Sequence, residues 1–302
     1  MKLQKKDKQL IVIVGPTAIG KTALSIKLAQ HLSTEIISAD SRQFYQEMSI
    51  GTAKPSTEEM EGIKHHFINN TSIHKDYNAG IFEREAITTI ENIFASKNKV
   101  IMVGGSGLYV DAVCKGLDSV PKKNEAIRAD LESKLANQGI EILQQELKKL
   151  DPHFYHNTDL NNGQRLVRAL EVCISSGKPY SYFRNNEEKE RNFEVVKIGL
   201  NSERSTVYRR INQRVDQMLE NGLLEEVKQL HEYKQLNALQ TVGYKELFDF
   251  LDGKIETIDE AVETLKRNTR RFAKRQLTWF RKDPKTMWYE PEELNEIFQL
   301  FK

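Results

Sequence analysis

Gly15-Pro16-Thr17-Ala18-Ile19-Gly20-Lys21-Thr22 matches the pattern G-x-x-x-x-G-K-[ST] and sets the fold of this chain. Five apolar residues, Leu10 to Val14, precede it, and a helical pattern from Ala23 to His31 follows. In this strand–loop–helix setting, successive backbone N–H groups face an anion, and the start of the helix adds a partial positive charge. Lys21 adds a full charge, and the Thr22 hydroxyl is suited to Mg²⁺. The sequence therefore predicts a site for a di- or triphosphate group.

The first 120 residues alternate between strand-like and helix-like stretches. Alternation of this kind predicts a parallel α/β sheet, and short apolar strands without polar alternation fit burial on both faces. The expected strands are Leu10–Val14, Glu35–Ser38 and Val100–Val103, and the expected helices follow Lys21, lie near Thr57–Lys64 and span Ala79–Ser96.

From Pro121 onward, helical patterns dominate. We predict an α/β core formed by residues 1–120 and 191–302, interrupted by a helical insertion at 121–190. The expected elements are helices at 124–136, 140–150 and 161–176, a strand at 194–200, and helices at 202–220, after Leu223 and at 259–281.

Polar residues follow the other two early strands. Asp40 comes directly after the second strand, and Ser106 stands among glycines after the third. Because ligands bind at the carboxyl ends of parallel strands, we expect both side chains near the phosphate site. Asp40 can cap a turn, assist Mg²⁺ or act as a general base, and Ser106 can form a turn or bind phosphate. The third strand ends in glycine where a nucleotide hydrolase needs an acid, which weakens an ATPase interpretation.

Composition indicates an ordinary globular chain. Of 302 residues, 39% are hydrophobic and 29% are charged, with a net charge of +2. Cys114 and Cys173 are the only cysteines, which excludes a disulfide framework. The first apolar run ends at Val14, too short for a signal peptide or a membrane span. We expect a cytoplasmic monomer without membrane contact.

One segment is strongly basic. Between Thr264 and Lys282 the chain has eight lysines and arginines, no acid, and four interleaved large apolar residues, among them Phe272 and Trp279. Cations on more than one face of a helix favour nucleic-acid binding, and a solvated face offset by the acids at 256–263 is the alternative.

Several motifs together resemble the tRNA dimethylallyltransferase family, the isopentenyl transferases that modify tRNA, in its bacterial form. The resemblance runs along nearly the whole chain in the family's order. It rests on Gly15–Thr22, Ser38–Gln43, Gly51–Pro55, Gly104–Tyr109, Gln164–Glu171, Gln240–Glu246 and Arg270–Arg281. Ser106 departs from the pattern, since the family commonly has threonine there, but a hydroxyl is kept.

The resemblance implies transfer of a dimethylallyl group from its diphosphate to the exocyclic amine of the adenine 3′ to the anticodon. Residues Gly15, Pro16, Thr17, Ala18, Ile19, Gly20, Lys21 and Thr22 would hold the diphosphate, with Mg²⁺ at Thr22. Lys21, Thr22 and Ser106 would stabilise the leaving group, and Asp40 would accept the proton of the amine.

The resemblance also implies that the insertion and the basic segment contact the anticodon stem-loop of tRNA. The residues so implied are Asp40, Ser41, Arg42, Gln43, Ser106, Arg128, Gln164, Arg165, Leu166, Val167, Arg168, Gln240, Thr241, Gly243, Tyr244, Lys245, Arg270, Arg271, Lys274, Arg275 and Arg281. Arg128 is equally well interpreted as a solvated helix arginine.

Three other functions remain open from the sequence. A small-molecule P-loop kinase would use the insertion as a lid, but it leaves the basic segment unexplained. A nucleotide-regulated nucleic-acid-binding protein leaves Asp40 and Ser106 without a role. An adenylate isopentenyltransferase would act on free nucleotides and has less need of Gln164–Arg168 and Arg270–Lys282.

Overall fold

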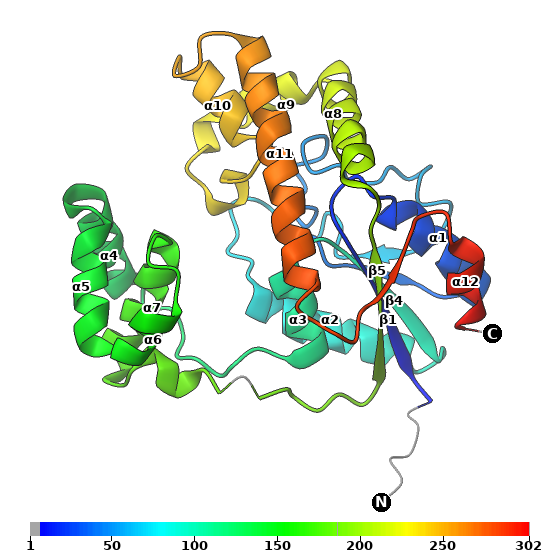
Figure 1. The fold of residues 1–302 in the computed structure, drawn as a ribbon, viewed down its shortest axis with the longest axis horizontal. Coiled ribbons are helices and arrows are strands. Elements are labelled where there is room, and N and C mark those ends of the chain that lie inside the picture. The colour runs from blue at the N-terminus through cyan, green and yellow to red at the C-terminus, as the bar shows by residue number, and fades with distance from the viewer. Residues whose placement is uncertain (1–6, 186, 302) are drawn as a thin grey trace, which may run out of the picture. The chain divides into compact units, whose positions relative to one another are not determined.

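The computed structural model describes residues 7–185 and 187–301 and divides the chain into two compact units (Figure 1). One unit combines the chain up to Cys114 with the chain from Glu190 onward, and the other is Lys115–Lys189. Each unit has a hydrophobic core of its own. In the described residues, no helix is both long enough and apolar enough to span a bilayer.

The first unit is built on a six-stranded sheet in the order β3-β2-β4-β1-β5-β6, with every pairing parallel. This order places β1 at the centre, between β4 and β5, as an α/β sheet with a central phosphate loop requires. The strands are β1 (Gln9–Val14), β2 (Ile36–Ser38), β3 (His65–His66), β4 (Lys99–Val103), β5 (Glu194–Leu200) and β6 (Met287–Tyr289).

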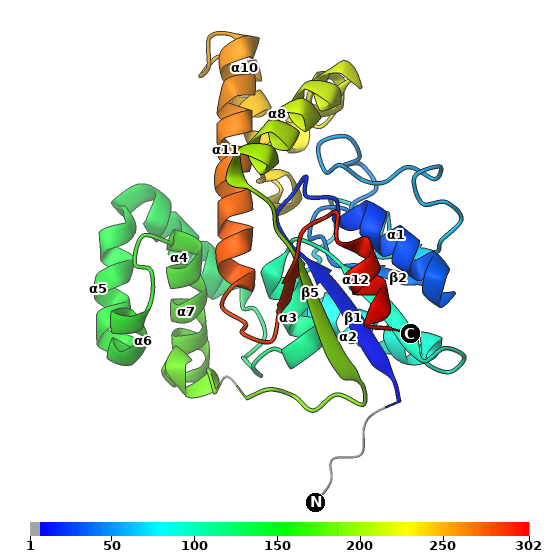
Figure 2. The ribbon, with the colours of Figure 1, turned by 45° about the vertical axis from the view of Figure 1, so that its right-hand side comes forward.

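Strand β1 shows why the sheet is covered on both faces. Its side chains alternate, so that Leu10, Val12 and Val14 join one buried cluster while Ile11 and Ile13 join the other. Figure 2 shows α1 and α12 on one side of β1 and β5, with α2 and α3 on the opposite side. The helices of this unit are α1 (Lys21–Leu32), α2 (Ala79–Ile93), α3 (Gly107–Lys115), α8 (Arg204–Glu220), α9 (Leu223–Gln229), α10 (Lys245–Leu251), α11 (Ile258–Phe280) and α12 (Leu294–Gln299).

The helix expected near Thr57–Lys64 does not form, and this part of the chain consists of turns. The backbone N–H and hydroxyl of Ser56 bond to nearby glutamates, which competes with a helical ladder. Glu61 and Gly62 then adopt φ values of 47° and 74°, which stop any helix that has begun.

The second unit is helical, with α4 (Glu125–Gln138), α5 (Ile140–Leu150), α6 (Pro152–Asn157) and α7 (Gly163–Ser176). Asn124, Asp151 and Asn162 cap the N-termini of α4, α6 and α7 through their side-chain oxygens. Leucines of α4, α5 and α7, such as Leu131 and Leu147, form its core.

Candidate phosphate-binding and catalytic site

The sheet order brings the ends of β1, β2 and β4 together. The N–H of Ala39, after β2, donates to the Val103 carbonyl at 2.7 Å, and the N–H of Gly104, after β4, donates to the Ile13 carbonyl at 3.2 Å. Ser106 Oγ accepts the N–H of Ser41 at 2.9 Å and donates to Ser41 Oγ at 3.1 Å. Asp40, Ser106 and the phosphate loop are therefore neighbours, as the sequence predicts.

Within the phosphate loop, Gly20 directly precedes α1, and its backbone is left-handed with φ of 107°. No side chain caps α1, so the first N–H groups of this helix are available to an anion. Lys21 Nζ donates back to the Pro16 carbonyl at 2.8 Å. Burial, followed by the nearby Arg214 charge, lowers the pKa of Lys21 to about 7, although Asp40 acts in the opposite direction.

Helix α8 adds two arginines that the sequence analysis missed. Arg214 Nη1 lies 3.4 Å from Thr17 Oγ1, and Arg210 Nη1 lies 3.4 Å from the Ile19 carbonyl. Burial lowers the pKa of the Arg214 guanidinium, which indicates a cation held in a poorly solvated place. Two arginines four residues apart lie on the same face of a helix, and this spacing in the sequence could have identified them as a cationic pair. Arg210 also pairs with Glu292 at 3.5 Å, so Arg214 is the better placed of the two arginines to serve an anion in the loop.

Gln276 of α11 was also missed, and it joins the two glycine-rich loops. Its Oε1 accepts the N–H of Thr17 at 2.9 Å, and its Nε2 donates to the Gly105 carbonyl at 3.0 Å. A Cβ on Gly105 would lie 2.1 Å from Nε2, so only glycine permits this approach. Gln276 is nearly fully buried on the same face as Ala273 and Phe280. In the sequence, Gln276 occupies a helix position where the spacing predicts an apolar residue, and this mismatch could have identified it.

Asp40 is half-buried at the start of a turn. Its Oδ1 accepts the N–H of Arg42 at 3.0 Å, so it does cap a turn. Its second carboxylate oxygen makes no hydrogen bond within the described part of the chain. Asp40 is close enough to Lys21 to influence its titration. The cap therefore orients the carboxylate and leaves one oxygen for chemistry.

Gln43 follows this turn, and both ends of its amide are occupied within the protein. Its Oε1 accepts from Ser38 Oγ at 3.2 Å, while its Nε2 donates to the carbonyls of Thr52 and Ala53, each at 3.2 Å. Gln43 thus connects the end of β2 to the segment that follows Ser49.

Helix α11 divides into two parts with different charge environments. Near its start, Lys266 pairs with Asp216 of α8 at 2.8 Å and with Glu263 at 3.2 Å, so acids offset this cation. Arg270 donates to Asn212 Oδ1 at 2.7 Å. Further along, an exposed group has no acidic partner among the described residues and comprises Arg271, Lys274, Arg275 and, after the helix, Arg281.

Two aromatic side chains, Phe272 and Trp279, stand among these cations with 37% and 38% exposure. Arg275 lies over the Phe272 ring, and Trp279 Nε1 donates to Asp111 at 2.8 Å. Exposed aromatic rings beside unpaired arginines are typical of surfaces that bind RNA.

The segment before α10 is more buried than a contact surface would be. Tyr244 has no exposed surface and donates to Glu226 Oε1 at 2.6 Å. Gly243 N donates to Glu246, while Gln240 Nε2 donates to the Lys234 carbonyl. Gln240 and Lys245 are exposed and Thr241 is half-buried, whereas the Tyr244 side chain belongs to the core.

In the second unit, α7 presents its predicted residues on opposite faces. Leu166 and Val167 are fully buried in the unit's core, so the structure does not support their side chains as tRNA contacts. Their burial follows from the amphipathic spacing of α7. Gln164 and Arg165 are exposed, while Arg168 is half-buried.

Glu171, one turn beyond Arg168, is a fully buried acid that the sequence analysis did not single out. It accepts the Asn124 N–H at 2.7 Å and pairs with Arg128 at 3.2 Å and Arg168 at 3.0 Å. Arg128 also donates to Gln164 and Glu132, each at 3.0 Å. The charge of Arg128 is therefore largely neutralised inside the unit.

Replacing Glu171 with glutamine is expected to lower the free energy of unfolding by about 3 kcal/mol, because two arginines lose their buried counter-charge. Urea unfolding of the full chain, followed by circular dichroism, measures this change. Glu132→Gln is the matched control, since Glu132 binds the same Arg128 at the surface and should matter by less than about 1 kcal/mol. Equal midpoints for the two variants would contradict the prediction.

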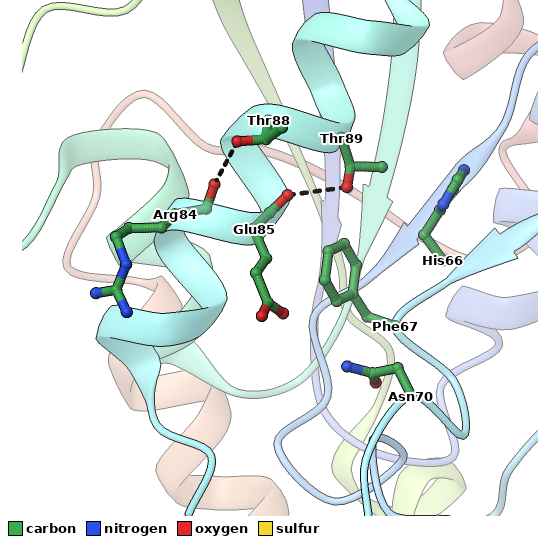
Figure 3. Close-up of a pocket in the computed structure, with 7 residues that line it drawn as sticks. All are labelled: His66, Phe67, Asn70, Arg84, Glu85, Thr88 and Thr89. Atoms are coloured by element: carbon green, nitrogen blue, oxygen red, sulfur yellow. Dashed lines mark hydrogen bonds between the residues drawn. The ribbon is translucent and has the colours of Figure 1, made fainter.

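A separate hollow of about 560 Å³ lies between α2 and the residues at and after β3 (Figure 3). His66, Phe67 and Asn70 line one side, and Arg84, Glu85, Thr88 and Thr89 line the other. The two threonine hydroxyls bond back to their own helix, and Glu85 accepts from Tyr77 at 2.7 Å. None of the residues that line it belongs to the phosphate loop.

The parallel sheet, the phosphate loop after its central strand and the polar residues at the adjoining strand ends define a P-loop NTPase-like α/β protein. Within that class, the family model of IPP transferases matches residues 43–283. The chain therefore belongs to the tRNA dimethylallyltransferase (IPP transferase) family, and the predicted family and fold class are confirmed.

Curated relatives and solved structures support the same family assignment. The tRNA dimethylallyltransferase of Christiangramia forsetii is 54% identical to this chain, and the alignment covers 94% of each protein. That of Flavobacterium johnsoniae is 52% identical, and the alignment covers 96% of each protein. The tRNA isopentenylpyrophosphate transferase of Bacillus halodurans has 39% identity and a TM-score of 0.71, covering 97% of this chain and 95% of that one. A eukaryotic dimethylallyltransferase acting on tRNA has 32% identity and a TM-score of 0.76, and the match covers 90% of this chain and 70% of that one.

Proposed function

We propose that this chain transfers a dimethylallyl group from dimethylallyl diphosphate to the exocyclic amine of the adenine 3′ to the anticodon in tRNA, releasing diphosphate. The single observation that carries the proposal is the cationic phosphate loop with a carboxylate beside it. Lys21 and Arg214 provide charge for a departing diphosphate, and Asp40 keeps an oxygen for an incoming amine. Family membership supplies the class of substrates.

At the leaving group, negative charge grows as the allylic carbon–oxygen bond breaks. The N–H groups of the loop, Lys21 and Arg214 would stabilise this charge with dipoles and cations already in place. Ser106 reaches the loop region from β4 and would donate its hydroxyl once released from Ser41. Gln276 keeps the two loops in register during the step.

At the nucleophile, an adenine amine is weak because its lone pair is delocalised into the ring. Asp40 would accept one of its protons as the new carbon–nitrogen bond forms. The base must leave the stacked loop to reach this carboxylate, at a cost of about a few kcal/mol that is smallest for an unpaired loop base.

Mg²⁺ fits this site only as an ion held mainly by the substrate. In residues 7–185 and 187–301 no cluster of three or more His, Cys, Asp or Glu side chains is arranged for a metal. The exposed Thr22 hydroxyl and the Asp40 carboxylate are oxygen donors of the kind that Mg²⁺ accepts beside phosphate oxygens and water. When bound, the ion would neutralise diphosphate charge, and Thr22 would hold it.

For tRNA, we propose the exposed face of α11 and the exposed residues of α7 as contact surfaces. On α11 these are Arg271, Lys274 and Arg275 with the Phe272 and Trp279 rings, and on α7 the best placed residue is Arg165. Phosphate contacts by these cations would make tRNA binding dependent on salt.

The test incubates the protein with dimethylallyl diphosphate, Mg²⁺ and an anticodon stem-loop RNA, and detects prenylated adenosine by mass spectrometry. We expect product with this RNA and none when guanine replaces the target adenine. Prenylation of AMP in preference to RNA would instead indicate an adenylate isopentenyltransferase. Transfer of a phosphoryl group from ATP, with no prenylation, would indicate a kinase and overturn the proposal.

A further inference from the structure

A half-buried anchor lies outside the residues assigned so far, at Glu226 of α9. Its carboxylate accepts three successive backbone N–H groups, those of Ser49 at 2.9 Å, Ile50 at 2.8 Å and Gly51 at 3.0 Å. Tyr244 donates to the same carboxylate at 2.6 Å. A charged acceptor with four donors is among the stronger polar arrangements in proteins, and it fixes the start of the segment Ser49–Pro55.

The fit around Gly51 shows how closely Tyr244 holds this segment. A Cβ on Gly51 would lie 2.6 Å from the Tyr244 ring, so the ring packs directly on the glycine backbone. Tyr244 is fully buried and cannot turn away. Position 51 thus needs glycine, because the Tyr244 ring occupies the space of a side chain there.

The anchored segment in turn holds the residues next to the catalytic carboxylate. The carbonyls of Thr52 and Ala53 accept both hydrogens of the Gln43 amide, whose oxygen accepts from Ser38 at the end of β2. Asp40 lies between Ser38 and Gln43 in the chain. Hydrogen bonds at residues 49–51 and at residues 52–53 therefore connect Glu226, through the backbone between them, to Gln43 in the turn that follows Asp40.

We propose that Glu226 and Tyr244 are positioning residues that hold the Ser49–Pro55 segment, and through Gln43 the Asp40 turn, in the geometry that receives the acceptor base. This inference rests on the proposed function. It assigns no contact with either substrate to Glu226. Small displacements of a reacting group lower rates by up to about 100-fold, which sets the scale of the effect.

The experiment compares Glu226→Gln with Glu225→Gln in the full chain. Glutamine at 226 keeps one acceptor oxygen but places an amide donor against backbone N–H groups. Glu225 precedes it on the same helix and pairs only with Lys228 at 3.6 Å, at the surface, among the interactions of the described chain. Each variant is assayed for kcat and KM with the stem-loop RNA, for binding of inorganic diphosphate, and for hydrogen exchange at residues 45–55.

For Glu226→Gln we expect kcat to fall roughly 10- to 100-fold. Exchange at Ser49–Gly51 should rise, while diphosphate affinity stays within about twofold, since the phosphate loop is not part of this anchor. Tyr244→Phe, which keeps Glu226 on its three N–H groups, should lose less activity. Glu225→Gln should match the wild type in all three measurements.

Four results would overturn the inference, and they are distinguishable. If the wild type prenylates RNA and Glu226→Gln does so equally fast, or if Glu226→Gln loses diphosphate binding together with activity, the positioning role is wrong. If the wild type does not prenylate RNA at all, the proposed function fails and takes this inference with it. Unchanged exchange at Ser49–Gly51 would contradict the anchor itself, whatever the activity.

Discussion

Replacing Asp40 with asparagine is expected to lower kcat for prenylation of the stem-loop RNA by about 10²- to 10⁴-fold, with tRNA affinity nearly unchanged. Asparagine keeps an Oδ1 that can accept the Arg42 N–H, so the turn should persist. What it removes is the carboxylate that would take the proton of the amine. Single-turnover rates at saturating RNA measure the chemical step, and filter binding measures RNA affinity.

Asp76→Asn is the matched control for Asp40→Asn. Asp76 is an exposed acid whose charge, like that of Asp40, raises the pKa of Tyr109, so it stands in the same electrostatic surroundings. Removing it changes the net charge equally without removing the proposed base. A similar rate loss in both variants, or weakened RNA binding with normal turnover for Asp40→Asn, would contradict a general-base role.

Much of the fold follows from local patterns in the sequence. The strands at Leu10–Val14, Val100–Val103 and Glu194–Leu200 are apolar runs between turn residues, and the structure has strands there, with β5 matching residue for residue. Strands β3 and β6 were not predicted. Each has two or three residues and lies at an edge of the sheet, so it forms by pairing with its neighbour and carries no periodicity of its own.

The candidate site was predictable where a motif defines it and not where single residues complete it. The phosphate loop, Asp40 and Ser106 each follow the end of a strand, and the topology of a parallel sheet brings these strand ends together. Arg214, Gln276 and Glu226 stand inside regular helices, and they follow the loop residues they contact by 197, 259 and 177 residues, respectively. Only tertiary packing selects them from the many polar residues on these helices.

Replacing Lys21 with methionine is expected to lower kcat by about 10²- to 10³-fold, because one preorganised cation at the departing diphosphate is lost. Methionine has a similar length and keeps the apolar stem, so the loop backbone should be retained. Diphosphate affinity should also fall, in contrast to Asp40→Asn. Initial rates at saturating substrates and calorimetric binding of inorganic diphosphate separate the two effects. Unchanged diphosphate affinity in Lys21→Met would contradict the assignment of this lysine to the leaving group.

The depressed pKa of Lys21, about 7, makes diphosphate binding a proton-linked event. A bound anion favours the ammonium, so binding raises this pKa. At pH 6 the lysine is already protonated and binding takes up almost no proton through it. At pH 8 it is mostly neutral, and binding should take up close to one proton, so affinity falls as pH rises through 7. Calorimetry in buffers of different ionisation enthalpy measures this proton uptake. The Lys21→Arg variant stays charged, so its proton uptake comes from diphosphate alone and can be subtracted from the wild-type value. Equal proton uptake by wild type and Lys21→Arg at pH 8 would show that Lys21 is already charged before the anion arrives.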